Sequence, residues 1–289
     1  ISNEGIEFEA QYDVIRKKNW NWSVGFNLSH NKNMLRKTYN GEDLNDKVLG
    51  RPVYGIYTFK DEGIVQKEED IPMYLNASGK QIPLYFQSIN NPLRVGGRKI
   101  KDQNYDGVID DKDLYYAGST LPAVYGGLNS HLEWKGLSFD VLFSYTISRK
   151  VMNMYKNSAF TFTKDFGVIM NYFHAGDFWT TSNRDAKYPS LEFADKDYVG
   201  QFDGNVDSNI ENISFLRLKQ LVIGYQIPKN WLKGSFIKDA NVYLSGENLF
   251  LLTNYSGVDP EIINPYSGKD DGTQYPLNRK VTLGLNLKF

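Results

Sequence analysis

The stretch "KVTLGLNLKF", residues 280–289, is the most regular pattern in the chain, because apolar residues alternate with polar or small ones throughout. The apolar set is Val281, Leu283, Leu285, Leu287 and Phe289, and the other set is Lys280, Thr282, Gly284, Asn286 and Lys288. Successive side chains of a strand point to opposite faces of a sheet. This period of two therefore predicts a β-strand with one apolar and one polar face.

Similar alternation recurs along the chain and predicts further strands. They are expected at residues 6–14, 20–29, 128–134, 137–147, about 213–227 and roughly 240–251. Inside the fifth strand, "FLRLKQ" (215–220) is out of phase with the residues that follow, which predicts a β-bulge. The sequence thus predicts an all-β fold of about seven antiparallel strands.

The connections between these strands alternate between short and long. Long segments rich in Asn, Asp, Gly, Pro and Tyr cover roughly 31–122, 149–212 and 252–278, whereas the other links are brief. Outer-membrane barrels sort their connections in this way, with short turns at one rim and long loops at the other. Strands of about 9 to 13 residues also suit a tilted membrane crossing. We therefore expect a transmembrane β-barrel with long extracellular loops.

The orientation of the apolar face distinguishes a membrane barrel from a soluble sandwich. A barrel turns this face towards lipid, while a sandwich buries it between two sheets. Aromatic residues lie near the expected strand ends, as in the interfacial girdles of barrels: Trp20, Trp22, Trp134, Tyr145 and Phe250. These aromatic residues and the polar opposite faces favour the barrel.

Composition excludes several other functions. The 289 residues contain 33 Lys and Arg against 34 Asp and Glu, so no basic surface for nucleic acid is expected. There is no cysteine, which excludes disulfides and thiolate zinc sites. The three histidines lie far apart, and G-x-S-x-G, Walker and G-x-G-x-x-G motifs are absent from the sequence. An enzyme is not expected.

The stretch "DQNYDGVIDDKD", residues 102–113, follows the ligand spacing of a calcium loop. Oxygen donors fall at Asp102, Asn104, Asp106, the Val108 carbonyl, Asp110 and Asp113, and Gly107 permits the sharp turn. The last position is usually Glu, so the shorter Asp113 departs from the pattern. A structural calcium ion that stiffens the segment 31–122 is expected. A metal-free loop closed by Asx turns is the alternative.

Two further groups are candidate functional residues. Tyr172, Phe173, Phe178 and Trp179 lie in an aromatic-rich segment, where they could stack on a sugar ring or hold a peptide. Packing against neighbouring loops is the alternative for these four side chains. The aromatic Phe289 at the end of the last strand is similar to the signal that the barrel-assembly machinery reads, and an ordinary strand end is its alternative.

Several segments in the same order resemble the SusC/RagA family of TonB-dependent outer-membrane transporters from Bacteroidetes, near the C-terminal end of those proteins. They are "KDQNYDGVIDDKDLYYAGSTLPAVYGGLNSHLEWKGLSFDVLFSY", "SFLRLKQLVIGYQIPKNWL", "NVYLSGENLFLLTNYSGVDPE" and "YPLNRKVTLGLNLKF". The resemblance covers most of the chain; residues 40–92 and 150–205 contribute little to it. It implies a 22-stranded barrel in the bacterial outer membrane, closed by an N-terminal plug.

The resemblance also implies partners and a function. A SusD-like surface lipoprotein would capture glycan or peptide, and TonB would power its import through the plug, which is expected to lie outside residues 1–289. Seven strands cannot close such a barrel, so the edge strands are expected to pair with the remaining barrel strands. Residue 1 would then lie at the outer rim and Phe289 at the periplasmic rim. A soluble, calcium-stapled carbohydrate-binding sandwich and a plug-less porin-like channel are the alternatives.

Overall fold

The computed structural model describes residues 1–43, 47–154, 173–194, 198, 200–201 and 205–289. Seven long strands form one antiparallel sheet in which spatial neighbours follow chain order. They are β1 (Ser2–Lys17), β2 (Trp20–Met34), β11 (Val124–Trp134), β12 (Leu137–Asn153), β13 (Ile210–Gln226), β14 (Asp239–Thr253) and β16 (Lys280–Lys288). The all-β antiparallel prediction is confirmed, and most of these strands extend beyond the predicted bounds.

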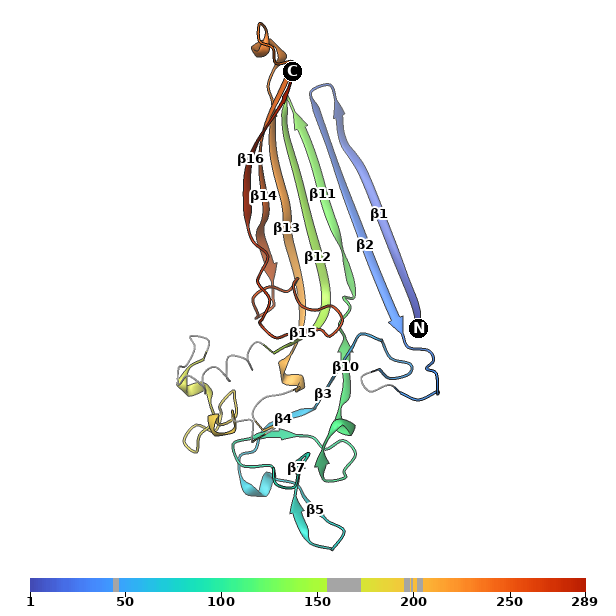
Figure 1. Cartoon of the computed structure of the whole chain (residues 1–289), viewed down its shortest axis with the longest axis vertical. Coiled ribbons are helices and arrows are strands. Elements are labelled where there is room, and N and C mark those ends of the chain that lie inside the picture. The colour runs from blue at the N-terminus through green and yellow to red at the C-terminus, as the bar shows by residue number, and fades with distance from the viewer. Residues whose placement is uncertain (44–46, 155–172, 195–197, 199, 202–204) are drawn as a thin grey trace.

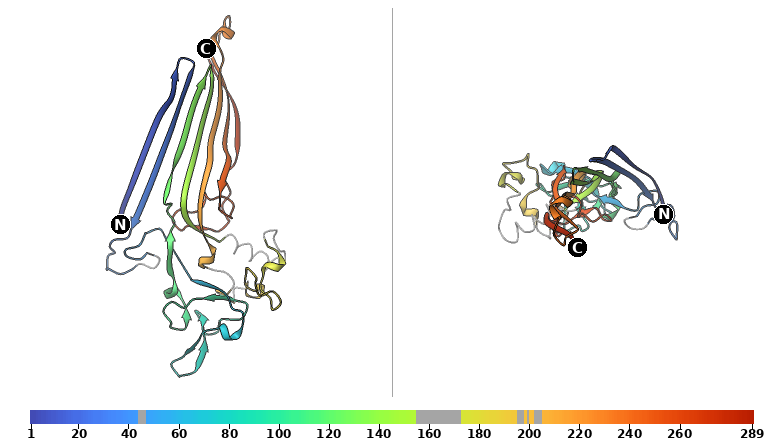
Figure 2. Two further views of the ribbon diagram at one scale, coloured as in Figure 1. Left: turned by 180° about the vertical axis from the view of Figure 1, so that it is seen from behind. Right: turned by 90° about the horizontal axis from the view of Figure 1, so that it is seen from above.

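Short and long connections lie at opposite ends of this sheet (Figures 1 and 2). The turn end carries residues 18–19, 135–136 and 227–238, of which the last contains the 3-10 helix η7 (Lys229–Leu232). The loop end carries the described residues of the segments 35–123, 154–209 and 254–279. β1 begins at the loop end and β16 finishes at the turn end, as expected for seven antiparallel strands.

The register aligns the predicted apolar residues into continuous rows across the strands. One row runs through Trp20, Trp134, Leu137, Tyr225, Val242 and Leu285. The next runs through Trp22, Leu132, Phe139, Ile223, Leu244 and Leu283. The opposite face is mainly polar, and one of its rows contains Asp13, Ser23, His131, Asp140, Val222, Ser245 and Thr282.

The apolar face is exposed rather than packed. Leu283 is 75 % exposed, Val281 68 % and Phe8 55 %, whereas a sandwich would bury all three. Most of the buried hydrophobic residues instead lie beyond the sheet, in the loop end; one cluster is Val65, Ile71, Leu84, Phe86, Leu93, Ile100, Ile109 and Val206. An apolar face of this extent needs an apolar medium, so this structure argues against the sandwich.

The out-of-phase segment of β13 is a bulge, as predicted. Its pairing with β14 shifts between Leu218 and Gln220, and its pairing with β12 shifts at the same place. Lys219 is the extra residue of β13 relative to β12, whereas β14 has the extra residue in its pairing with β13. Before the bulge the apolar positions are even-numbered, as at Leu216 and Leu218. After it they are odd-numbered, as at Leu221 and Ile223, because the bulge shifts the alternation by one residue.

Small sheets build the loop end. β3 (Gly55–Thr58) pairs with β10 (Tyr115–Ser119), β4 (Asp61–Ile64) with β8 (Arg98–Ile100), β5 (Met73–Leu75) with β6 (Gln81–Pro83), β7 (Tyr85–Phe86) with β9 (Val108–Ile109), and β15 (Lys269–Asp270) with β12. Short 3-10 helices, including η2 (Asp111–Asp113), η3 (Ala175–Asp177) and η6 (Asp207–Asn209), complete this end. Among the described residues, no helix is long and apolar enough to cross a membrane.

β1 and β16 are the two edges of the sheet and do not pair with each other. The described residues therefore form an open sheet. In hydrocarbon, each edge would leave a row of unpaired backbone groups, each of which costs several kcal/mol. The pairing of both edges with strands from outside residues 1–289 stays a prediction.

Candidate functional site at the loop end

A buried ion pair fixes the segment between β14 and β16 to the sheet. Arg217 of β13 lies 2.5 Å from Asp259, and both side chains are 3 % exposed. The Nε atom of Arg217 lies 2.7 Å from Glu261, which also contacts Lys219. Asp259 in turn accepts a hydrogen bond of 3.1 Å from the Leu277 backbone N–H. The bulge thus presents two cations to one folded segment.

Arg149 of β12 holds the same segment through backbone carbonyls. Its guanidinium donates to Thr120 O at 3.0 Å, Ile263 O at 3.2 Å and Asn264 O at 3.3 Å. The residue is 7 % exposed. The rigid fork of an arginine can satisfy several acceptors at once, so one side chain joins three segments that are distant in sequence.

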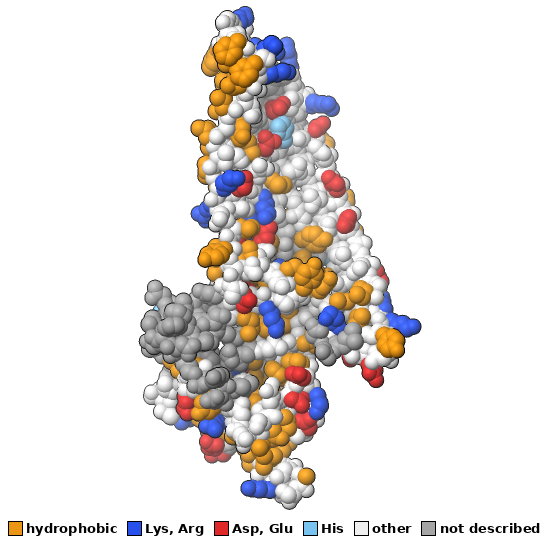
Figure 3. All heavy atoms as spheres, viewed as in Figure 1, with side chains coloured by type: hydrophobic (Ala, Val, Ile, Leu, Met, Phe, Trp, Pro, Cys, Tyr) orange, Lys and Arg blue, Asp and Glu red, His pale blue; other side chains and the backbone are white. Residues whose placement is uncertain are grey.

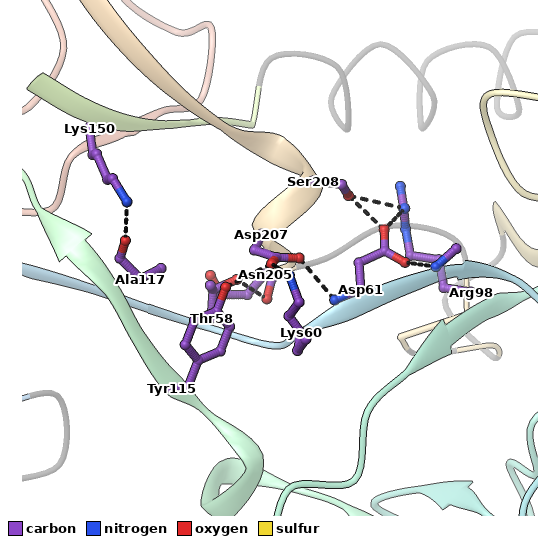
Figure 4. A network of polar contacts seen from close by, with 11 residues as sticks. Thr58, Lys60, Asp61, Arg98, Tyr115, Ala117, Lys150, Asn205, Asp207 and Ser208 are labelled. Carbon is purple, nitrogen blue, oxygen red and sulfur yellow. Dashed lines mark hydrogen bonds and ion pairs between the residues drawn. The ribbon is translucent and has the colours of Figure 1, made fainter. Parts of the chain in front are cut away.

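Asp207, just before β13, is the centre of a second polar network (Figure 4). Its carboxylate accepts hydrogen bonds from Lys60 Nζ at 2.6 Å, from the Asp61 backbone N–H at 2.9 Å and from the Tyr115 hydroxyl at 2.7 Å. Asp61 pairs with Arg98 at 2.5 Å, and both side chains are buried. The network joins β4, β8 and β10 to the start of β13.

The chemistry of this network predicts an acid-sensitive loop end. Burial alone would raise the pKa of Asp207, but the donors Lys60, Asp61 N–H and Tyr115 hold its pKa below the usual value. A depressed pKa stabilises the fold above the unfolded-state pKa of about 3.9, and this contribution is lost as pH falls through the lower folded-state pKa. We expect Tyr115 to become accessible in that acid range.

Hydroxyl-radical footprinting of Tyr115 in the full-length protein measures this release. The Asp207→Asn variant is expected to expose Tyr115 already at neutral pH and to lose the acid step. Glu69→Gln is the matched control, because the Glu69 side chain is 76 % exposed and lies outside the network. An acid step that survives in Asp207→Asn would contradict the role of this carboxylate.

The loop 102–113 folds around its own backbone. Asp102 is 5 % exposed and accepts from Tyr105 N at 2.7 Å and Gly107 N at 2.9 Å. Asp113 is fully buried and accepts from Gln103 N at 2.7 Å and Asp110 N at 2.9 Å. Gly107 has φ +85. These contacts are the Asx-type closure named above as the alternative.

The remaining predicted metal ligands lie on the outer side of this loop. Asn104 Oδ1 accepts from Asp106 N at 3.0 Å, and Asp106 Oδ1 accepts from Val108 N at 3.0 Å. The Lys112 ammonium lies 3.7 Å from Asp106 and 3.5 Å from Asp110. Within the described part of the chain, no three His, Cys, Asp or Glu side chains converge closely enough for a metal ion. The order of oxygen donors fits calcium, and calcium binding by this loop stays a prediction.

The aromatic residues predicted to contact ligand are buried in the loop end where the structure describes them. Phe173 and Phe178 are each 3 % exposed and pack with Tyr188 and Phe193 in one cluster. Trp179 is 7 % exposed and donates from Nε1 to Gln66 Oε1 at 3.0 Å. Tyr172 lies outside the described residues. The three described side chains therefore pack against loop residues in this structure, and their contact with ligand stays a prediction.

A cavity of about 940 Å³ opens at the loop end. Three tyrosines line it together with Asn205, Asp111 and Lys269: Tyr54, Tyr57 and Tyr266. The rings of Tyr54 and Tyr266 lie 5.4 Å apart. The volume is in the range of small-ligand sites, and the lining combines aromatic ring faces with hydrogen-bond donors and acceptors.

Phe289 lies at the turn end, where its ring stacks on Phe236. It is 62 % exposed, and its role as an assembly signal stays a prediction. The sequence reasoning missed Arg149, Arg217 and Asp207. Arg217 lies between Leu216 and Leu218 inside a predicted strand, and a charged residue in that position was a usable signal, whereas Arg149, between Ser148 and Lys150, lies beyond the end of the predicted strand. Asp207 lies in an irregular polar segment and had no such signal.

The arrangement is an open antiparallel sheet of long strands, with short turns at one end and folded loops at the other, as in part of the wall of a large β-barrel. Comparison with known proteins supports this architecture. Over its whole length the chain is 30 % identical to TonB-dependent receptor P26 of Formosa agariphila, and it covers 29 % of that receptor. It is 26 % identical to TonB-dependent receptor SusC of Bacteroides thetaiotaomicron and covers 26 % of it. No protein-family model matches the chain.

Solved structures agree on the fold. The RagAB peptide transporter matches 99 % of the chain with a TM-score of 0.69 and 24 % identity, and the chain covers 29 % of that protein. The RagAB peptide importer in its open-open state matches with a TM-score of 0.66. The chain is therefore SusC/RagA-like and corresponds to part of a TonB-dependent receptor. It spans less than one third of the relatives that it matches.

Proposed function

We propose that the chain forms wall and external loops of an outer-membrane importer of nutrients. The observation that supports this most directly is the exposed apolar face of the long strands, opposite a mainly polar face. Lipid would cover the first and the aqueous interior would meet the second. The edges β1 and β16 would pair with the rest of the barrel, and TonB would act through segments outside residues 1–289.

The loop end is the proposed substrate side of the importer. Its tyrosine-lined cavity suits either a glycan, whose C–H faces pack on aromatic rings, or a peptide, whose amides hydrogen-bond to groups such as Asn205. A SusD-like lipoprotein would cap this end. The loop end supports docking because its segments are tied together by Arg149, Arg217 and the Asp207 network rather than free to move independently.

Cysteine labelling tests the membrane topology, because the 289 residues contain no cysteine. Ala77→Cys lies at the loop end and Asn19→Cys at the turn end. In intact cells that make the full-length protein without other cysteines, a membrane-impermeant maleimide should label the first variant only. Permeabilised cells should label both. Equal labelling in intact cells would contradict the proposed orientation.

Growth of a strain that lacks the full-length gene tests import. Cells are supplied with either an oligosaccharide mixture or a peptide mixture as the carbon source. Loss of growth on one of them, restored by the wild-type gene but not by a gene whose product cannot contact TonB, would support import and name the substrate class. Unchanged growth on both mixtures would contradict the proposal.

Calcium binding by residues 102–113 is a separate proposal with its own measurement. Calorimetry on the full-length protein should show calcium heat that Asp102→Asn together with Asp106→Asn removes. Lys112→Gln should instead tighten binding by about fivefold, because one unit charge near 4 Å in water contributes about 1 kcal/mol. Identical heats in wild type and in the Asn variant would mean that the loop holds no calcium.

A further inference from the structure

The turn between β13 and β14 continues the apolar face of the sheet beyond the strand ends. Trp231 is 73 % exposed and Phe236 is 77 % exposed. Phe236 stacks on Phe289, with ring centroids 5.6 Å apart and planes 14° from parallel. Phe289 shares the alternation of Leu285 and Leu287, so it belongs to the apolar face. The stacking therefore places Phe236 on that face as well.

A second aromatic pair lies at the same end of the sheet. Trp20 and Trp134 are directly opposite each other in the register, their ring centroids are 6.0 Å apart, and each is 42 % exposed. The ammonium of Lys135 lies 5.5 Å from the Trp134 ring. Aromatic rings with a polar edge are the residues that settle at the boundary between lipid tails and headgroups.

Basic residues accompany these rings. The segment 227–238, "IPKNWLKGSFIK", contains three lysines and no acid. The basic residues of the turn end are Arg16, Lys17, Lys18, Lys135, Lys229, Lys233, Lys238 and Lys288. Nearby acids are fewer, and Asp13 is paired with Arg16 at 3.6 Å while Asp239 accepts from Gln226. Figure 3 shows hydrophobic side chains beside Lys and Arg side chains at this end.

We infer that the turn-end patch, Lys229, Trp231, Lys233, Phe236 and Lys238, binds the phosphate groups of anionic phospholipids. The rings would enter the outer part of the hydrocarbon, and Lys229 and Lys233 would extend towards the headgroups. Lys238 donates to the Phe289 carbonyl at 3.2 Å and would add its charge beside the stacked rings. A neutral headgroup would lack the net negative charge that a basic patch attracts. This inference rests on the proposed membrane position. It adds that the protein prefers anionic lipids in the leaflet that surrounds the turn end.

Native mass spectrometry on the full-length protein tests the patch. The protein is inserted into bilayers that contain phosphatidylglycerol and phosphatidylcholine in equal amounts. It is then released in the mass spectrometer, and the lipids that stay bound to it are counted. Lys229→Gln, Lys233→Gln and Lys238→Gln are combined in one variant. The matched control combines Lys37→Gln, Lys67→Gln and Lys80→Gln, which remove the same charge from the loop end.

Wild type and control should retain phosphatidylglycerol preferentially, and the turn-end variant should lose this preference by up to about fivefold for each lysine removed. Inorganic phosphate at equal ionic strength should not displace the lipid. Equal retention by the turn-end variant, or displacement by phosphate, would overturn the inference. If the wild-type protein inserts but shows no lipid preference, only this inference is contradicted. If the wild-type protein fails to insert, the proposed function is contradicted.

Discussion

Replacing Val281 by Arg is expected to destabilise the membrane-inserted protein by about 2–4 kcal/mol. Val281 is 68 % exposed on the apolar face and lies opposite Gly246, so the larger side chain displaces no packed neighbour. It lies four residues from Leu285, which belongs to the row of Trp20 and Trp134. At about 3.3 Å per residue along a tilted strand, this places it near the middle of a band about 25 Å tall.

The neighbouring Thr282→Arg variant is the matched control. Thr282 belongs to the opposite face, in the row of Ser245 and His131. An added charge there meets water and polar groups, and we expect an effect below about 1 kcal/mol. Urea unfolding of the full-length protein from lipid bilayers measures both variants. Equal destabilisation by the two substitutions would mean that lipid does not cover the apolar face.

Replacing Arg217 by Met is expected to release the segment 254–279 from the sheet. Asp259 would remain buried without its cation, and breaking a buried pair in this way costs about 3–5 kcal/mol. The Leu277 amide reports this directly, because it donates to Asp259 at 3.1 Å. Its hydrogen exchange in the full-length protein should accelerate by more than about a hundredfold.

Two companion variants separate charge from packing. Lys219→Met removes the more exposed cation of the same group and should change exchange at Leu277 by less than about fivefold. Asp259→Leu combined with Arg217→Met removes both buried charges, so much of the lost stability should return. Urea unfolding measures this variant, because the Leu277 amide has lost its acceptor. A double variant as unstable as Arg217→Met would show that the apolar parts of these side chains, rather than the charges, hold the segment.

Most of the sheet was predictable from sequence, because the alternation of apolar and polar residues in each strand reflects the different surroundings of its two faces. The alternation in residues 280–289 appears in the structure as β16, and the phase change at "FLRLKQ" appears as the bulge at Lys219. Strand ends were less predictable. β1 and β2 continue to Ser2 and Met34, past the point where alternation fades, because pairing between backbones continues there without an apolar face.

The contacts of the loop end were not predictable in the same way. Arg217 and Asp259 are 42 residues apart, and Asp207 meets Lys60 across 147 residues. Such pairs leave no local periodicity. The loop 102–113 shows a related limit, because the same spacing of Asp and Asn serves both metal binding and Asx turns.

The order of the strands in the sheet has a consequence for how such proteins diversify. β2 and β11 are adjacent, although 89 residues separate Met34 from Val124, so the intervening segment leaves and re-enters the sheet at neighbouring points. Lengthening a closed segment is thermodynamically mild, at about 0.6 kcal/mol for each doubling. Evolution, or a designer, can therefore exchange the whole segment 35–123 between two unchanged strands.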